Sequence, residues 1–347
     1  MREHDADTAG ELEILEHERD PHGPVSYAGV PHASLPYALP EPDAPLRVTF
    51  VGQRSLVEPH LLSAPADGVT PAFIDFRDGT GWEPVGAALA ADTPDVVVVL
   101  RPDVVPAGAL AGLPAAVLGV STEPLPNAEL IAHPNLDYGL QMLRRTDSAN
   151  FDRVLVSDPL CFHAAATAVP AWRAHPLPVD DRLFAAPRPA EHPPRTIFIG
   201  HSTVHRERSI VGLKHLFDVR HYAHALLGDE LIEALGSADI GLSLLNDYEI
   251  VRFQPLMLVL LAAGLLVIAE EPGPGFGLEP GIHYVQVRDL HDLDLRMHQL
   301  AASPDAYERV RLRGNHFAQQ FRASRVWPRL LRDLLDDLRA FGSERSG

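Results

Sequence analysis

The chain is poor in lysine and cysteine, and its 347 residues include one of each, Lys214 and Cys161. A P-loop needs a lysine after a glycine-rich turn, and Ser-Ile-Val-Gly-Leu before Lys214 does not form one. Schiff-base chemistry would have to rest on Lys214 alone. One cysteine excludes an internal disulfide and any zinc or iron–sulfur site that needs several cysteines. A reducing, cytoplasmic setting fits this composition.

Positive charge is also scarce, with 29 Lys+Arg against 47 Asp+Glu and a net charge of −18. Nucleic-acid binders normally carry a basic stripe, so we expect no nucleic-acid partner. The first 20 residues lack the apolar core of a signal peptide. The longest apolar run, residues 255–269, is shorter than the roughly 20 residues of a membrane span. We therefore expect a cytoplasmic protein without a transmembrane segment. Arginine in place of lysine, with many alanines and prolines, is typical of GC-rich bacterial genomes.

The sequence does contain enough apolar residues, 46%, for a packed core. Short apolar runs that often end in glycine alternate with helical patterns, which predicts βαβ units and parallel, doubly wound sheets. The class is therefore α/β with two Rossmann-like domains. Strands are predicted over 46–51, 72–76, 96–100, 115–119 and 153–156, then over 196–200, 219–222, 240–244, 265–269 and 284–287. Helices are predicted over 56–62, 82–91, 207–216, 228–235, 254–263, 305–321 and 327–341.

The prolines mark the domain organisation. Residues 175–194 hold six prolines and separate the two sets of strands, as a linker would. The predicted parts are an N-terminal extension over 1–42, a first Rossmann-like domain over 43–178, a second Rossmann-like domain over 179–325, and a C-terminal helix over 326–347 with the option of crossing back. At roughly 150 residues per domain, two domains match the length.

Several motifs resemble those of GT-B glycosyltransferases of the group-1 and spore-maturation type. The motifs are 154–159 (VLVSDP), 177–180 (LPVD), 198–200 (FIG) followed by 206–208 (RER), 238–244 (ADIGLSL), 255–264 (PLMLVLLAAG) and 277–281 (GLEPG). The resemblance covers residues 46–340 and implies two Rossmann-like domains that face each other across a cleft. It also implies a nucleotide-sugar donor as substrate, no bound metal and no further cofactor.

One position departs from this family. Its retaining members have a glutamate five residues before the glycine of the 255–264 motif, where it hydrogen-bonds the ribose; here the residue is Val259. A second acid, eight residues earlier, is replaced by Val251. An apolar side chain cannot accept a hydroxyl hydrogen bond. Three alternatives follow: Glu249, Arg252 or Gln254 supplies the contacts, the donor is bound differently, or the site has decayed.

The strand that ends at Gly200 offers a phosphate site, because glycine lets the backbone approach a phosphate. The cations beside it would stabilise the charge that develops on a nucleoside diphosphate leaving group. The alternative is that the arginines are solvated charges on the first helical turn. The expected diphosphate contacts are Gly200, His201, Arg206 and Arg208, and the residues expected beside the nucleoside or sugar are Asn246, Glu249 and Arg252.

An inverting transferase needs a general base in the acceptor domain, whereas a retaining one does not. Glu123 and Asp158 follow predicted strands and are the catalytic candidates, with Asp75 and His163 as further acids or bases at strand ends. The turn at residues 52–55 would face the same cleft. Each of these residues has an ordinary structural role as its alternative.

Other patterns have simpler explanations. The histidine pairs at 201/205 and 221/224 are better explained as scattered surface histidines than as metal ligands. Residues 273–277 are not a dinucleotide-binding motif but would lie beside the donor. The leucine-rich terminal helix is amphipathic and is expected to pack on a domain, with peripheral membrane contact as the alternative.

The sequence as a whole predicts a glycosyltransferase that moves a sugar from a nucleotide sugar to an acceptor of unknown kind, a small molecule, a glycan or a protein. The alternative is a non-catalytic binding or scaffold protein that kept the GT-B shape and lost donor-site residues. A sugar-nucleotide epimerase is a third option, for which no dedicated motif is present.

Overall fold

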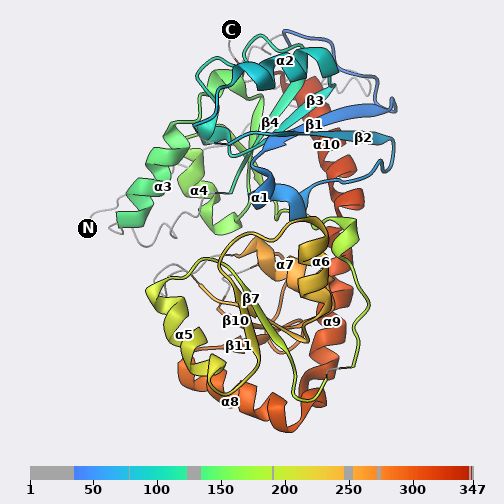
Figure 1. Ribbon diagram of the computed structural model, residues 1–347. Coiled ribbons are helices and arrows are strands. Elements are labelled where there is room, and N and C mark those ends of the chain that lie inside the picture. The colour runs from blue at the N-terminus through green and yellow to red at the C-terminus, as the bar shows by residue number, and fades with distance from the viewer. Residues whose placement is uncertain are drawn as a thin grey trace, which may run out of the picture.

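The computed structural model describes residues 35–77, 79–122, 134–189, 191–245, 253–271, 275–343 and 345. These residues form two parallel β-sheets, one above the other in Figure 1, with helices packed on both. The expected α/β class is therefore confirmed. Of the N-terminal extension expected over 1–42, residues 35–42 are described.

The first sheet has six parallel strands in the order β2-β1-β3-β4-β5-β6. The strands are β1 (Leu46–Gly52), β2 (Val69–Asp75), β3 (Val96–Leu100), β4 (Ala116–Ser121), β5 (Arg153–Val156) and β6 (Ala171–Ala174). The helices between them are α1 (Arg54–Val57), α2 (Glu83–Asp92), α3 (Pro134–Arg144) and α4 (Phe162–Ala166). All five residues of β3 are buried, because helices cover both faces of a parallel sheet.

The second sheet has five parallel strands in the order β11-β10-β9-β7-β8. Its strands are β7 (Thr196–Ile199), β8 (Val219–Tyr222), β9 (Ile240–Ser243), β10 (Leu266–Glu270) and β11 (Val285–Val287). Its helices are α5 (Val204–Lys214), α6 (Gly228–Gly236), α7 (Pro255–Ala262), α8 (Leu290–Ala302) and α9 (Glu308–Ala318). In both sheets the first strand lies between the second and the third, so the strand order reverses beside β1 and beside β7. Ligands of open α/β sheets bind at the carboxyl ends of strands at such points.

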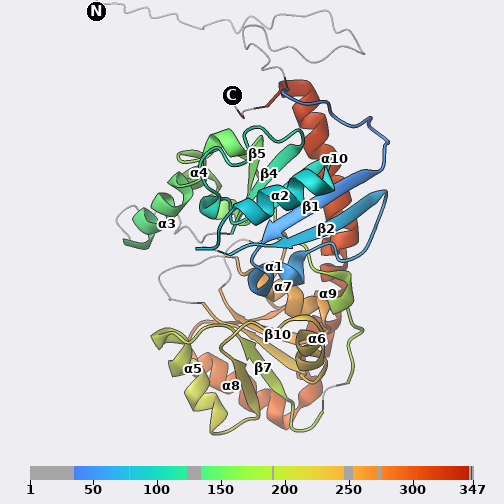
Figure 2. The ribbon, with the colours of Figure 1, turned by 45° about the horizontal axis from the view of Figure 1, so that its top comes forward.

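Helix α10 (Ala323–Phe341) returns from the second sheet to the first and runs along it (Figures 1 and 2). Its Trp327 is fully buried and meets Phe50 of β1 edge-on, with ring centroids 5.0 Å apart. Leu330, Leu331, Leu334, Leu335 and Leu338 lie in the same core. The leucine spacing of the sequence thus belongs to a helix whose apolar face is covered by the first sheet.

Two chain segments connect the domains side by side. Val179 donates its backbone N–H to the carbonyl of Phe321 at 2.8 Å, and Ala323 donates to the carbonyl of Val179 at 2.8 Å. The segment that leaves the first sheet is thereby hydrogen-bonded to the segment that returns to it. This pairing helps to determine the position of the second sheet relative to the first.

Candidate functional site

The loops at the carboxyl ends of the two sheets touch each other. Asp158 follows β5, and its Oδ2 accepts a hydrogen bond from the backbone N–H of Phe253, which precedes α7, at 2.9 Å. Asp180 donates its backbone N–H to the carbonyl of Pro59 at 2.8 Å. The two edges where ligands of such sheets bind therefore face the same boundary. We call the loops after β7, β9 and β10 the carboxyl edge of the second sheet.

The turn from β7 to α5 opens this edge. A side chain at Gly200 would place Cβ 3.1 Å from the Phe198 ring and 3.2 Å from the Arg206 guanidinium, and the residue has a φ of +156°. Both conditions favour glycine. Thr203 then caps α5, because its Oγ1 accepts from the backbone N–H of Arg206 at 3.2 Å. The predicted phosphate turn thus exists as a glycine turn followed by a capped helix.

Arg206 is buried, with 6% of its surface exposed, and its guanidinium joins two loops. Nη1 donates to the carbonyl of His201 at 3.1 Å, and Nη2 donates to the carbonyl of Leu244 at 2.8 Å. Nε lies 3.1 Å from the Leu244 carbonyl and 3.2 Å from that of Leu245. The predicted phosphate contact is therefore also the residue that holds the turn after β7 against the end of β9.

A histidine–glutamate pair lies at the same edge, and the sequence gave us no reason to select it. His205, in the first turn of α5, places Nε2 2.7 Å from Oε1 of Glu270, the last residue of β10. Oε2 of Glu270 accepts from the backbone N–H of Leu245 at 2.6 Å. An acid directly after the apolar run of a predicted strand is the one signal that could have pointed to Glu270.

The other predicted cations of α5 are more exposed. His201 and Arg208 both lie at the surface. Arg208 lines a groove of about 910 Å³ on the outer side of α5, together with Ser202, Thr203, Val204, Glu207, Val211, Gly212 and Leu290. The groove begins beside the carboxyl edge at Ser202 and Thr203.

Asp158 uses both carboxylate oxygens in hydrogen bonds to the backbone. Oδ1 accepts from the N–H of Leu160 at 2.9 Å, and Oδ2 accepts from Phe253 across the domain boundary. Asp75 caps the start of α1 by accepting from Arg54 N–H at 2.8 Å, and His163 is exposed on α4. Four further candidates lie outside the described residues: Glu123, Asn246, Glu249 and Arg252.

Val259, which the sequence resemblance predicts to replace a ribose-binding glutamate, is fully buried in α7. The described residue among its proposed substitutes is Gln254, whose Nε2 donates to the Leu244 carbonyl at 2.9 Å. A glutamate at position 259 would be enclosed by the core, where an unpaired carboxylate is strongly destabilising. Gln254, by contrast, lies at the carboxyl edge.

His60 sits where the first sheet, the linker and α10 meet. Its Nδ1 lies 2.8 Å from the carbonyl of Pro178, and its own carbonyl accepts from Trp327 Nε1 at 2.9 Å. Burial lowers the pKa of His60 to about 4, although the Pro178 carbonyl and Asp180 act in the opposite direction. The ring is therefore neutral at physiological pH, with Nδ1 donating to Pro178.

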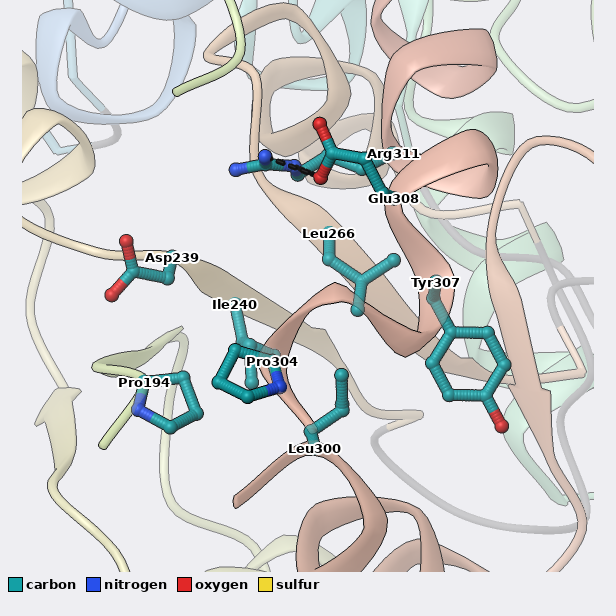
Figure 3. Close-up of a pocket in the computed structure, with 9 residues that line it drawn as sticks. All are labelled: Pro194, Asp239, Ile240, Leu266, Leu300, Pro304, Tyr307, Glu308 and Arg311. Carbon is teal, nitrogen blue, oxygen red and sulfur yellow. Dashed lines mark hydrogen bonds and ion pairs between the residues drawn. The ribbon is translucent and has the colours of Figure 1, made fainter. Parts of the chain in front are cut away.

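A small pocket at the opposite edge of the second sheet is drawn in Figure 3. Asp239, Ile240 and Leu266 line it where β9 and β10 begin, beside the ion pair of Glu308 and Arg311. Its volume of about 10 Å³ is near the least that holds one water. It is too small for a nucleotide.

Solved structures match this fold. No protein-family model and no curated protein matches the sequence. HepE from Anabaena in complex with UDP-glucose is similar with a TM-score of 0.54 at 11% identity, over 83% of this chain and 99% of that chain. A UDP-forming α,α-trehalose-phosphate synthase from Burkholderia xenovorans has a TM-score of 0.50 at 11% identity, over 85% and 99%. Sucrose-phosphate synthase from Thermosynechococcus elongatus has a TM-score of 0.50 at 12% identity, over 83% and 99%.

These neighbours are GT-B glycosyltransferases, so the chain has the GT-B fold with two Rossmann-like domains. The expected fold is thereby confirmed. No helix in the described part of the chain combines the length and apolarity that a membrane span requires.

Proposed function

We propose that this chain is a GT-B glycosyltransferase of the group-1 and spore-maturation type. It binds a nucleotide sugar at the carboxyl edge of the second sheet and transfers the sugar to an acceptor held by the first domain. The observation that carries the proposal is the glycine turn at Gly200 followed by the capped helix α5, placed where the two sheets meet. HepE, which has the same fold, is seen with UDP-glucose.

The chemistry follows from the leaving group. Transfer releases a nucleoside diphosphate, so a transferase stabilises negative charge that develops on the diphosphate. The N-terminus of α5 and nearby cationic side chains lie at the carboxyl edge, where a helix N-terminus favours negative charge. His201 and Arg208 are exposed enough to reach a ligand. Arg206 would act indirectly, because it holds the loops that would surround the diphosphate.

Asp158 is better suited to positioning than to removing a proton. A general base needs an oxygen directed at the acceptor, and both Asp158 oxygens accept backbone N–H groups. For an inverting reaction, Glu123 remains a candidate for the general base. A retaining reaction would need neither residue.

A thermal-shift screen with UDP, GDP and dTDP tests the donor site. A nucleoside diphosphate that binds the folded chain raises its melting temperature, and a concentration 100 times Kd stabilises it by about 2.7 kcal/mol. Release of sugar from UDP-, GDP- and dTDP-sugars, with and without candidate acceptors, then tests catalysis. No shift with any nucleotide would contradict the proposal.

A non-catalytic binding protein is the second candidate, and one observation favours it. Val259 is buried in the core at the position where the resembling family has its ribose-binding glutamate. A chain of this kind would turn over no sugar donor, and the absence of a thermal shift with any nucleotide would favour it. A chain that turns a donor over excludes it.

A further inference from the structure

One carboxylate joins three segments of the carboxyl edge. Glu270, at the end of β10, reaches His205 of α5 through Oε1 at 2.7 Å and the backbone N–H of Leu245, after β9, through Oε2 at 2.6 Å. The side chains of His205 and Glu270 are 23% and 14% exposed. The imidazole is therefore held in one orientation while part of its surface stays open to a ligand.

A pair that keeps some exposure contributes little to stability. The carboxylate instead fixes the direction of the ring, because the hydrogen bond at one ring nitrogen determines how the other nitrogen is presented. A histidine oriented in this way, in the first turn of a helix that follows a glycine turn, is suited to contact an anion.

The basic side chains near His205 on α5 are held or exposed in other ways. Arg206 donates to the carbonyls of His201 and Leu244, and Arg208 lies exposed beside the outer groove. Lys214 ends the helix, remote from its first turn. His205 differs from Arg206 in being held by a carboxylate, that of Glu270 at the end of β10, whereas Arg206 is held by backbone carbonyls.

We propose that His205 contacts the diphosphate of the nucleotide donor and that Glu270 is the positioning residue that orients its ring. The inference rests on the proposed function. It assigns the phosphate contact to a histidine held by an acid, in addition to the arginines that follow it. Glu270 acts through His205 and through the loop that begins at Leu245.

Titration calorimetry with matched nucleotides tests the contact. The probes are UDP and uridine, or GDP and guanosine where the guanine nucleotide binds more tightly. His205→Gln keeps a polar side chain that can still meet Glu270 but removes the second ring nitrogen, so the diphosphate should bind about tenfold or more weakly. Nucleoside binding should be unchanged. His215→Gln, at the other end of α5, is the control and should bind both like the wild type.

Glu270→Gln tests the positioning role, because glutamine keeps an oxygen for Leu245 and loses the charge that faces His205. It should weaken diphosphate binding in the wild type and have little further effect in His205→Gln, as coupled residues do in a double-mutant cycle. His205→Arg should restore part of the affinity. Equal diphosphate affinity of His205→Gln and the wild type would overturn the inference alone. A wild-type chain that binds no nucleoside diphosphate would overturn the proposed function as well.

Discussion

Arg206 shows how a single residue shapes the site. Its buried guanidinium donates to carbonyls that belong to the turn after β7 and to the end of β9. Hydrogen bonds from a charged donor are stronger than neutral ones, and the planar fork of arginine serves several acceptors at once. The residue therefore stabilises the geometry in which a diphosphate would be held.

Arg206→Lys should lower the free energy of unfolding by about 1–3 kcal/mol, because one ammonium cannot replace donors that point to two loops. Urea denaturation measures the change. Arg208→Lys is the control, and as an exposed substitution it should stay within about 0.5 kcal/mol of the wild type. An Arg206→Lys chain of unchanged stability would mean that the guanidinium does not hold the loops.

At this scale the sequence predicted a turn with cations after it but not the contacts that these residues make. The glycine turn and the cations that follow it were predicted from a strand that ends in glycine. The carbonyl partners of Arg206 were not, because Leu244 and Leu245 are 38 and 39 residues away along the chain. Glu270 and His205 are 65 residues apart and were missed for the same reason.

The bounds of helices and strands were predictable where the local sequence determines them. Both ends of β5 and β8 match the prediction, since each is a short run between turn signals. Helix α5 begins at Val204, three residues before its predicted start, because Thr203 caps it. Helices α3, α4 and α8 and strand β6 were not predicted. Helix α8 mixes acids, histidines and leucines, and β6 is a half-buried edge strand without an apolar run.

Two helical glycines give a matched test of element packing. A Cβ at Gly314 of α9 would lie 2.3 Å from the carbonyl oxygen of His283 and 2.7 Å from Leu261 of α7. Gly314→Ala should therefore destabilise the fold by roughly 1–3 kcal/mol or more, as overpacking does. A Cβ at Gly212 of α5 would meet no atom within 4 Å, so Gly212→Ala should stabilise by about 0.5–1 kcal/mol. Both are read from urea denaturation, and shifts of the same sign would contradict the packing of α9.

On the scale of the whole molecule, the domains are joined by buried contacts around His60. Its ring meets Pro178 of the linker, and its carbonyl meets Trp327 of α10. The parallel direction of the strands in each sheet was predicted, because strands that alternate with helices run parallel. The placement of the two sheets relative to each other was not predicted, since it depends on contacts such as that of Asp158 with Phe253, 95 residues apart.

The lowered pKa of His60 gives a pH-dependent stability. The pKa is about 4 in the folded chain against 6.5 in the unfolded one, so below pH 6.5 the unfolded chain binds a proton that the folded chain does not. The free energy of unfolding should fall as the pH drops from 6.5 to about 4, by about 3 kcal/mol from this residue. Burial lowers the pKa of His175 and His283 too, which adds a loss of the same sign.

His60→Asn isolates the contribution of His60 to the pH dependence of the free energy of unfolding, because asparagine places a donor near the position of Nδ1 and does not titrate. The variant should be less stable than the wild type at neutral pH, and the difference should shrink towards pH 4. Urea denaturation over this range measures both curves. Curves that stay parallel would contradict a neutral, buried His60.

Hydrogen–deuterium exchange with and without a nucleoside diphosphate tests the central claim most directly. The nucleotide should slow exchange of backbone amides at residues 200–206, 244–245 and 269–271, the three loops of the carboxyl edge. Residues 239–240 and 304–311, around the small pocket at the opposite edge, should exchange as before. Protection confined to that opposite edge, or no protection with UDP, GDP or dTDP, would contradict a nucleotide-sugar site between the two sheets.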